Sequence, residues 1–189
     1  MEKKAREIIV IGGSAGAYEL IVDILDHLPA VFTPAIVIVL HRNSKYETKI
    51  ETNLSKRLKR KVTSILDKDH ILENQIYFAP PGYHTLIEPN LSFSLDVSDP
   101  VQFSRPSIDV FFETVAEIYG KQAIAFLLSG ANQDGMNGFK MLVQKGAKCF
   151  VQDPQEAIIN TMPLGGKGVS TEVQVLTNEQ IIEYFSLLT

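Results

Sequence analysis

Ser14 lies in the segment Gly12-Gly13-Ser14-Ala15-Gly16, between an apolar run and a predicted helix. The segment fits the pattern G-x-S-x-G, in which small neighbours let the chain turn sharply and expose a nucleophilic serine. The backbone amide of Ala15, at the start of the predicted helix, is a candidate donor to an oxyanion. We interpret Ser14 as a nucleophile for ester hydrolysis, and helix capping by its hydroxyl is the simpler alternative.

A phosphate-binding loop is the rival interpretation, because glycines after a first strand also bind dinucleotides. The dinucleotide pattern G-x-G-x-x-G would require glycine at positions 14 and 17, where the chain has Ser14 and Ala17. A P-loop would require a Gly-Lys-Ser/Thr ending, which the segment lacks. The sequence therefore disfavours a nucleotide-binding module.

His41 is the candidate general base. It directly follows the apolar run Ile36–Leu40, just as Ser14 comes soon after Glu7–Ile11. In a parallel sheet both residues would lie at the carboxyl edge, where such folds build their sites. His41 could then accept the hydroxyl proton of Ser14. His84 follows a Pro-Pro-Gly-Tyr turn and is a second candidate, as a residue that lines the pocket.

Asp134 is the candidate acid of the site. The most apolar predicted strand, Ala123–Leu128, ends in a glycine-bounded loop that contains this residue. Asp134 could accept a hydrogen bond from the ring of His41 and stabilise the imidazolium. Capping of the next helix is an equally simple role, and Asp153 is a rival acid. The loop amide of Ala131 is a further candidate oxyanion donor.

The elements that must position these residues alternate between strand and helix. Continuous apolar strands separated by amphipathic helices indicate a parallel sheet covered on both faces. We therefore expect an α/β fold in one domain, residues 1–189: three-layer and Rossmann-like, a mostly parallel sheet with helices on both faces and one antiparallel hairpin. The predicted strands are 7–11, 36–40, 62–65, 75–79, 123–128 and 147–151, the hairpin is 85–88 with 91–95, and the predicted helices are 15–27, 46–58, 107–119, 135–145, 155–160 and 178–188.

Composition narrows the class of protein. The chain has 189 residues, 45% of them hydrophobic, and a net charge of −4, which argues against nucleic-acid binding. No apolar stretch approaches the ~20 residues that cross a membrane, so we expect no membrane insertion. The single Cys149 cannot form an internal disulfide, which suits a reducing, cytoplasmic location. The basic cluster Lys56–Lys61 is interpreted as a solvated helix end. No metal-ligand spacing is present, and we expect no cofactor.

The candidate site residues lie in segments that resemble the catalytic domain of the chemotaxis receptor protein-glutamate methylesterase family, CheB. The resemblance runs through essentially the whole chain and rests on six segments: IVIGGSAGA, VIVLHRN, IYFAPPGYHTLIE, RPSIDVFFETVA, LLSGANQDGMNGF and VQDPQEAIINTMP.

The resemblance implies a Ser-His-Asp hydrolase, with Ser14 as nucleophile, His41 as base and Asp134 as acid. Members of this family remove methyl groups from glutamate esters on the cytoplasmic helices of chemoreceptors, and many also deamidate receptor glutamines. We therefore expect a carboxylic ester hydrolase whose substrate is a methylated receptor. The alternative is a catalytically idle signalling or receptor-binding domain of the same fold.

Some positions depart from the family pattern. Members usually carry a response-regulator domain before this region, whereas this chain starts at the first catalytic strand. We therefore expect a stand-alone form, and three alternatives stay open for its control: a separate regulator, the supply of substrate, or no control at all. The loop 129–135 reads SGANQDG where T-G-M-G-x-D-G is typical. Asn43 stands where a proline is common. These changes alter the rim of the pocket and leave all three catalytic groups in place.

Overall fold

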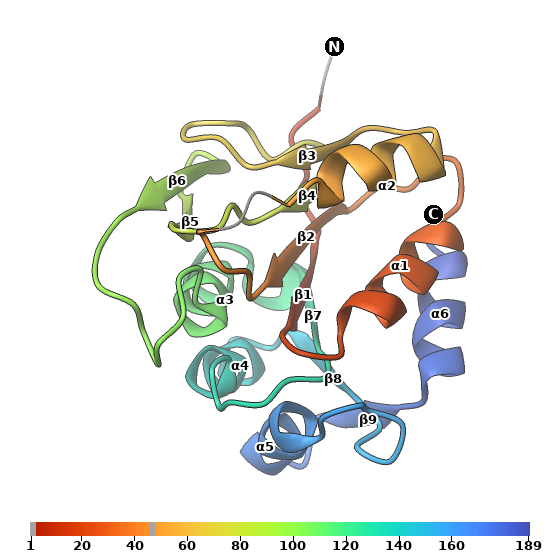
Figure 1. Cartoon of the computed structure of the whole chain (residues 1–189), viewed down its shortest axis with the longest axis vertical. Coiled ribbons are helices and arrows are strands. Elements are labelled where there is room, and N and C mark those ends of the chain that lie inside the picture. Colours follow the sequence, from red (N-terminus) through yellow and green to blue (C-terminus); the bar gives the residue numbers. More distant parts are fainter. Residues whose placement is uncertain (1–2, 46–47) are drawn as a thin grey trace.

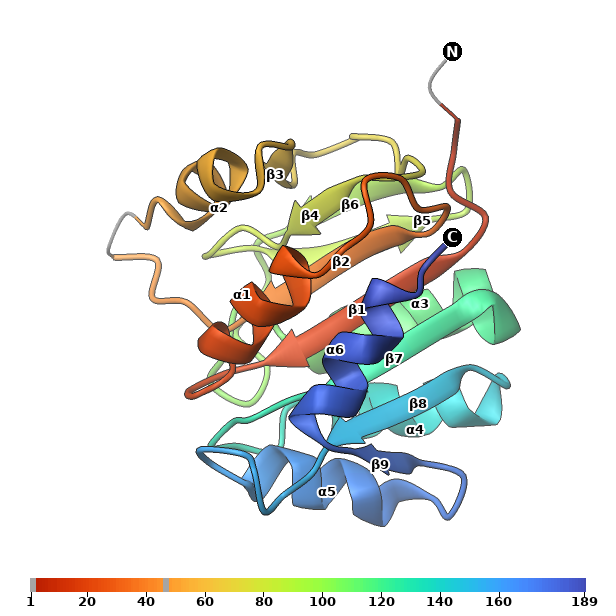
Figure 2. The same cartoon turned by 90° about the vertical axis from the view of Figure 1, so that its right-hand side faces the viewer.

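A computed structural model describes residues 3–45 and 48–189. Its main sheet has seven parallel strands in the order β3-β4-β2-β1-β7-β8-β9, with helices on both faces (Figures 1 and 2). The strands are β1 (Ile8–Gly13), β2 (Ala35–Leu40), β3 (Val62–Ser64), β4 (Ile76–Phe78), β7 (Ala123–Leu127), β8 (Lys148–Gln152) and β9 (Gln174–Leu176).

The two faces of the sheet bury two separate cores. Successive side chains of a strand point to opposite faces, so Ile8 and Val10 enter one core while Ile9 and Ile11 enter the other. The first core lies under α3 (Ile108–Tyr119), α4 (Met136–Gln144) and α5 (Thr161–Val169). The second lies under α1 (Tyr18–Asp26), α2 (Ile50–Leu58) and α6 (Asn178–Ser186), and Figure 2 shows α1 and α6 in front of the sheet.

A separate antiparallel hairpin packs against α3. It consists of β5 (His84–Glu88) and β6 (Ser92–Asp96), and the amide of Ile87 donates to Thr114 Oγ1 on α3 at 3.2 Å. From β6 the chain arches away from the body before it returns to α3 (Figure 1). A short 3-10 turn, Gly120–Gln122, leads from α3 to β7. The predicted fold class, including the hairpin, is confirmed.

The expected helix at 155–160 is wrong, because residues 154–159 form turns and bends. The helix here is α5, whose sequence TMPLGGKGV contains residues that usually break helices. Pro163 is tolerated because it lies in the first turn, where its missing N–H would have no partner in the helix. Gly166 lets α5 approach the sheet, since a Cβ there would lie 2.9 Å from side-chain atoms of Leu127 and Val151.

The short strand β9 was also missed by the sequence analysis. The predicted helix 46–58 begins at Ile50, and positions 46–47 lie outside the described residues.

The strand order places a topological switch point between β1 and β7. The chain builds β2, β3 and β4 on one side of β1, and then returns to build β7, β8 and β9 on the other. In parallel α/β sheets the crevice outside the carboxyl ends of such strands is the usual site of function. Ser14 directly follows β1 and His41 directly follows β2, so both lie at this edge.

Cys149 on β8 allows a test of the packing in the first core. Its side chain is buried, and burial raises the pKa of the thiol to about 12. Because the thiolate is the reactive form, the folded protein should resist iodoacetamide near pH 8. The chain unfolded in urea should be alkylated at once, as measured by mass spectrometry. Equal labelling rates for the folded and unfolded chains would contradict this packing.

Candidate active site

Ser14 is held where the ends of three strands meet. Its backbone amide donates to the carbonyl of Ser129 at 2.9 Å, and the amide of His41 donates to the carbonyl of Gly13 at 3.2 Å. Gly16 completes the turn with φ +84°, and a Cβ at this position would lie 2.6 Å from Ser129 Oγ. The sequence Gly-Ser-Ala-Gly thus fits a tight turn that presents the hydroxyl of Ser14 at the edge of the sheet.

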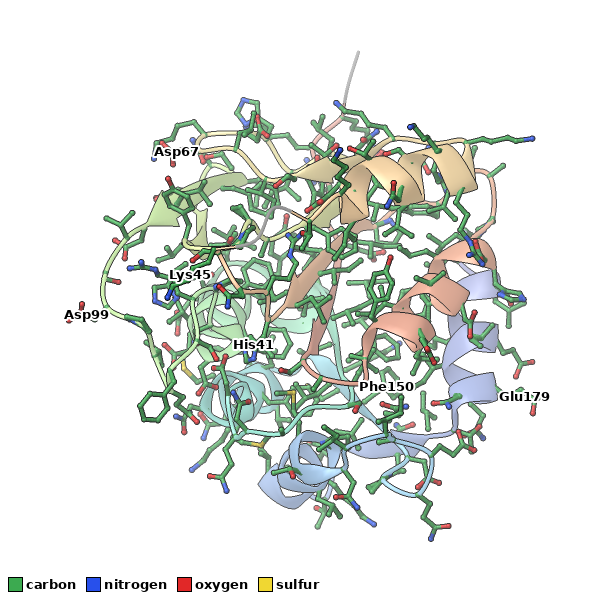
Figure 3. The ribbon with its side chains drawn as sticks, viewed as in Figure 1. His41, Lys45, Asp67, Asp99, Phe150 and Glu179 are labelled. Atoms are coloured by element: carbon green, nitrogen blue, oxygen red, sulfur yellow. The ribbon has the colours of Figure 1, made fainter. Side chains whose placement is uncertain are left out.

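The imidazole of His41 lies between Ser14 and Asp134 (His41 is labelled in Figure 3). Its Nδ1 is 3.2 Å from Ser14 Oγ, and its Nε2 is 2.7 Å from Asp134 Oδ2. An ionised carboxylate can only accept, so Nε2 carries the ring proton and Nδ1 presents a lone pair to Ser14. The structure brings together the three residues selected from the sequence, in the order that proton abstraction from Ser14 requires.

Asp134 is fully buried and accepts three further hydrogen bonds. Its Oδ1 accepts from Ser107 Oγ at 2.7 Å and from the Asp109 amide at 3.0 Å. Its Oδ2 accepts from the Ile108 amide at 2.7 Å as well as from His41. These amides belong to the first turn of α3, where the helix dipole favours a negative charge.

The hydrogen bonds determine the ionisation of Asp134. Burial by itself raises the pKa of this carboxyl, but the bonds from His41, the two α3 amides and Ser107 outweigh it and hold the pKa below its ordinary value. Asp134 does not cap the helix that follows it, because the N-cap of α4 is Gly135. Instead it accepts the first backbone amides of α3, a helix that lies well before it in the sequence. The rival acid Asp153 lies after β8 and accepts the amide of Gln155 at 2.9 Å.

The two candidate oxyanion donors lie on the turns that border Ser14. In the part of the chain that the structure describes, the amides of Ala15 and Ala131 donate to no other group. Ala15 directly follows Ser14, and a Cβ on Gly130 would lie 3.1 Å from the Cβ of Ser14. Both amides therefore stay candidate donors to an oxygen that develops charge beside Ser14.

His84 has a different place from the one expected. It is buried, its Nδ1 accepts from the Ser107 amide at 3.2 Å, and its Nε2 donates to the Asp99 carbonyl at 3.1 Å. Both ring nitrogens are thus used in fixing the segment before α3. His84 supports Ser107, and through it Asp134. His41 lines two depressions of the surface, and His84 lines neither of them.

Sequence reasoning missed three side chains around His41 and Asp134. Ser107 both donates to Asp134 and accepts from the Val110 amide at 3.3 Å as the N-cap of α3. Its position after a proline at a helix start was the available signal. Ser104 Oγ lies 3.4 Å from His41 Nδ1, and Asn132 donates to Ser104 Oγ at 3.4 Å. No local pattern marks these two, because their neighbours come from separate loops.

His41 lines two depressions. One, of about 500 Å³, has Ser14 in its wall and is otherwise lined mainly by Ala15, Tyr18, Leu40 and Ile50. The other, of about 400 Å³, is more polar and includes Arg42, Ser44, Ser104 and Arg105. An extended or helical segment lying across His41 would thus find apolar walls next to Ser14 and polar walls beyond it.

Comparison with known proteins shows the family of this chain. The family model described as CheB methylesterase matches residues 9–185. The chain belongs to the CheB methylesterase family. A relative from Leptospira interrogans, provisionally named protein-glutamate methylesterase/protein-glutamine glutaminase, is 40% identical over 95% of this chain and 93% of its own length. A relative from Hydrogenovibrio crunogenus with the same pair of activities in its name is 34% identical over 85% of this chain and 43% of its own length.

A solved structure is similar throughout. The catalytic domain of the CheB methylesterase of Thermotoga maritima is 27% identical and superposes with a TM-score of 0.85, covering 94% of this chain and 98% of that one. This agreement supports both the sheet order and the enzyme family. The chain spans less than half the length of the Hydrogenovibrio relative, and nearly all of the Leptospira one.

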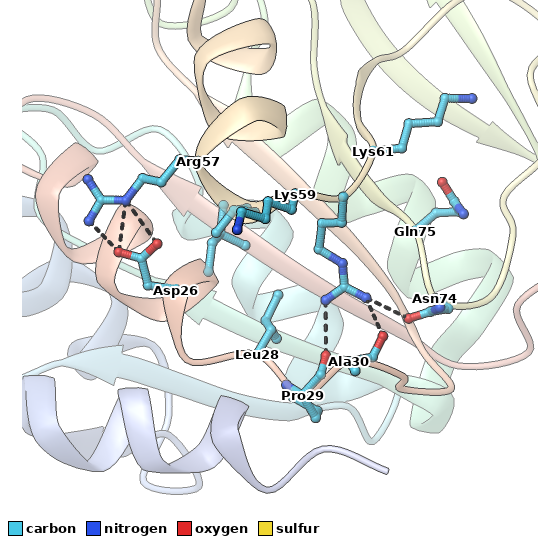
Figure 4. Close-up of a pocket in the computed structure, with 12 residues that line it drawn as sticks. Asp26, Leu28, Pro29, Ala30, Arg57, Lys59, Lys61, Asn74 and Gln75 are labelled. Carbon is cyan, nitrogen blue, oxygen red and sulfur yellow. Dashed lines mark hydrogen bonds and ion pairs between the residues drawn. The ribbon is translucent and has the colours of Figure 1, made fainter.

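A third depression in this CheB family member is lined by none of Ser14, His41 and Asp134 (Figure 4). It has a volume of about 520 Å³ and is bordered by the basic cluster at the end of α2. Arg57 pairs with Asp26 of α1, and Arg60 donates to the carbonyls of Pro29 and Ala30 at 3.0 and 2.9 Å. Arg57 therefore fastens α2 to the end of α1, and Arg60, just after α2, fastens the chain to the segment after α1. The lysines of the cluster are exposed.

Neither a metal site nor a spanning helix is found within residues 3–45 and 48–189 of this CheB family member. No three His, Cys, Asp or Glu side chains in these ranges lie close enough to hold a metal ion. No helix described there has both the length and the apolar character needed to cross a bilayer.

The lowered pKa of Asp134 predicts how the stability of this CheB family member depends on pH. The ionised carboxyl stabilises the folded state at pH values above the pKa that it has in the unfolded chain, which is near the ordinary 3.8. This stabilisation is lost as the pH falls through the lower pKa of the carboxyl in the folded state. Urea unfolding of Asp134→Asn should show a loss of about 1–3 kcal/mol at neutral pH, because buried donors lose an acceptor. The difference from wild type should shrink below about pH 4. A constant difference from neutral to strongly acidic pH would contradict the assignment.

Proposed function

We propose that this chain hydrolyses methyl esters of glutamate side chains on the cytoplasmic helices of chemoreceptors, releasing methanol. The observation that carries the proposal is the His41 ring, which lies between Ser14 Oγ at 3.2 Å and Asp134 Oδ2 at 2.7 Å. The substrate class is supported by membership of the CheB methylesterase family and by the names of the relatives. The site of action would be the cytoplasm, where those receptor helices lie.

In the first half of the reaction Ser14 Oγ bonds to the ester carbonyl carbon and its proton passes to Nδ1 of His41. The carbonyl oxygen becomes an oxyanion that the amides of Ala15 and Ala131 can stabilise. Asp134 keeps Nε2 protonated and stabilises the imidazolium. The bond to the methoxy group then breaks, the proton on Nδ1 passes to the methoxy oxygen, and methanol leaves an acyl-serine.

In the second half water attacks the acyl-serine and gives a proton to His41 Nδ1. The bond to Ser14 breaks, the proton returns to Ser14 Oγ, and the glutamate side chain leaves as a carboxylic acid that ionises. A glutamine side chain can enter the same sequence with ammonia as the leaving group. This parallels the second activity in the names of the relatives and gives the chain a proposed deamidase activity.

The test is methanol release from a methylated receptor fragment by the purified chain. A fragment with glutamine at the same positions measures ammonia release, and an unmethylated glutamate fragment is the blank. Methanol above the blank supports the proposed esterase. No methanol and no labelling of Ser14 by a fluorophosphonate would refute it and favour an idle binding domain.

A further inference from the structure

The arched segment between β6 and α3 carries an unusual tight turn, Val101–Ser104. Val101 and Ser104 exchange two backbone hydrogen bonds, of 3.1 and 2.9 Å. The two residues at the tip, Gln102 and Phe103, have φ values of +47° and +63°. Turns of this shape usually place Asn and Gly at the tip, because side chains disfavour positive φ. A phenylalanine at this position therefore adopts an unfavourable backbone conformation that the surroundings must maintain.

Contacts on both sides hold the turn against the active site. Gln102 Nε2 donates to Asp109 Oδ2 at 3.0 Å, and the buried Asp109 is itself fixed by the Gly138 amide at 2.8 Å. At the other end Arg105 donates to the carbonyls of Val97 and Ser98 at 2.7 and 2.8 Å, closing the base of the arch. Figure 3 labels Asp99 on this arch, at the outer edge of the view. The turn is therefore fastened to α3 and to its own base.

The ring of Phe103 is fully exposed at the tip of this fastened turn. The next residue, Ser104, lies 3.4 Å from the His41 ring, and both residues line the polar depression beside His41. Exposed single apolar side chains are common on protein surfaces. Here, however, the backbone that carries the exposed ring is held in an unfavourable turn beside His41, so a partner that packs on the ring would not have to order this turn.

We infer that Phe103 is a docking residue that packs on an apolar stripe of the helix carrying the ester and so delivers the ester to Ser14. This inference rests on the proposed function. The occupant is the protein substrate and not a second copy of this chain. Phe103 and His41 line the same depression, so a second copy seated on Phe103 would cover His41 and block the reaction. Phe103 touches none of Ser14, His41 and Asp134, so it acts on the substrate protein and not on the chemical step.

The test compares a large and a small substrate with Phe103→Ala. Methanol release from a methylated receptor fragment should lose about 10- to 100-fold in kcat/KM, mainly through KM, because an interaction made equally in ground and transition states is removed. The rate at which a small fluorophosphonate labels Ser14 should stay within about twofold of wild type. Phe103→Tyr keeps the ring and should retain most of the wild-type kcat/KM. Leu187→Ala removes another exposed apolar side chain, at the C-terminal end, and should change neither rate.

A second variant tests the role of the turn. Gln102→Ala keeps the ring of Phe103 but removes the tether to Asp109, so its kcat/KM on the receptor fragment should fall between those of wild type and Phe103→Ala. Thermal melting and circular dichroism check that each variant is folded.

Three outcomes would overturn the docking role. Phe103→Ala could leave kcat/KM on the receptor fragment unchanged, or it could lower fluorophosphonate labelling as much as it lowers kcat/KM on the fragment. The third outcome is a wild-type chain that runs as a dimer on size-exclusion chromatography and a Phe103→Ala variant that runs as a monomer. Failure of wild type itself to label Ser14 and to release methanol would instead refute the proposed function.

Discussion

Ser14→Ala is expected to lower kcat for methyl-ester hydrolysis by about 10⁴- to 10⁶-fold, which is the range found when the serine of a triad is removed. The reason is that, among the described residues, the other hydroxyl near Nδ1 of His41 is badly placed to replace it. Ser104 Oγ lies near the same ring nitrogen at 3.4 Å, but it is on the arched segment and not on the turn whose amide at Ala15 can stabilise an oxyanion. His41→Ala should give a similar loss, because Ser14 then has no acceptor for its proton. The measurement is methanol release under single-turnover conditions.

Ser104→Ala is the matched control for this prediction. It removes the second hydroxyl near His41 and should keep kcat within about tenfold of wild type, since Ser104 makes no bond in the proposed reaction. The double variant Ser14→Ala with His41→Ala should be hardly worse than either single one, because residues that act as a unit are not additive. Turnover near the wild-type rate in Ser14→Ala, or a greater loss in Ser104→Ala, would mean that the nucleophile is wrongly assigned.

Asp134→Asn is expected to lower kcat by about 10⁴-fold while the fold persists, as the corresponding change does in serine proteases. The amide nitrogen of asparagine would face His41 Nε2 and donate to it. The ring would then carry its proton on Nδ1, the nitrogen that must accept from Ser14. The loss should appear in kcat, because Asp134 is fully buried and cannot contact the substrate.

Asp153→Asn separates this role from a general effect of removing a negative charge near the edge of the sheet. Asp153 lies after β8 and its carboxylate accepts the amide of Gln155, so we expect kcat within about threefold of wild type. If Asp153→Asn were the crippling variant and Asp134→Asn nearly normal, the acid of the site would have to be reassigned.

The parts of the fold that the sequence predicted are those in which local pattern and tertiary role agree. The strands before Ser14 and His41 are buried on both faces, so they read as continuous apolar runs, and their ends could be located from the sequence alone. The helix α5 could not, because its glycines and proline oppose local helix propensity, and the close approach of Gly166 to β7 and β8 is a tertiary contact that no local pattern shows.

Within the site, predictability followed the same division. Ser14, His41 and Asp134 each follow or nearly follow a predicted strand, so their common edge could be inferred. The hydrogen bonds that fix Asp134 come from the start of α3, about 26 residues earlier in the chain, and depend on how α3 packs against the sheet. His84 was expected in the pocket because a turn precedes it. Its actual role depends on Ser107 and Asp99, which no local pattern connects to it.

The contacts of Asp134 with α3 have a consequence for how such proteins diverge. The same carboxylate that orients His41 also occupies the amides of Ile108 and Asp109, so a lineage that loses it weakens its fold as well as its chemistry. Within the described residues, the side chains of Ser14 and His41 accept no hydrogen bond from a backbone amide, so their loss costs the fold less. A descendant that abandons hydrolysis is therefore expected to lose the serine or the histidine first and to keep the aspartate long afterwards. In a set of related sequences, an aspartate at this position would therefore indicate only common ancestry. A serine and a histidine retained together would indicate that selection still maintains the activity.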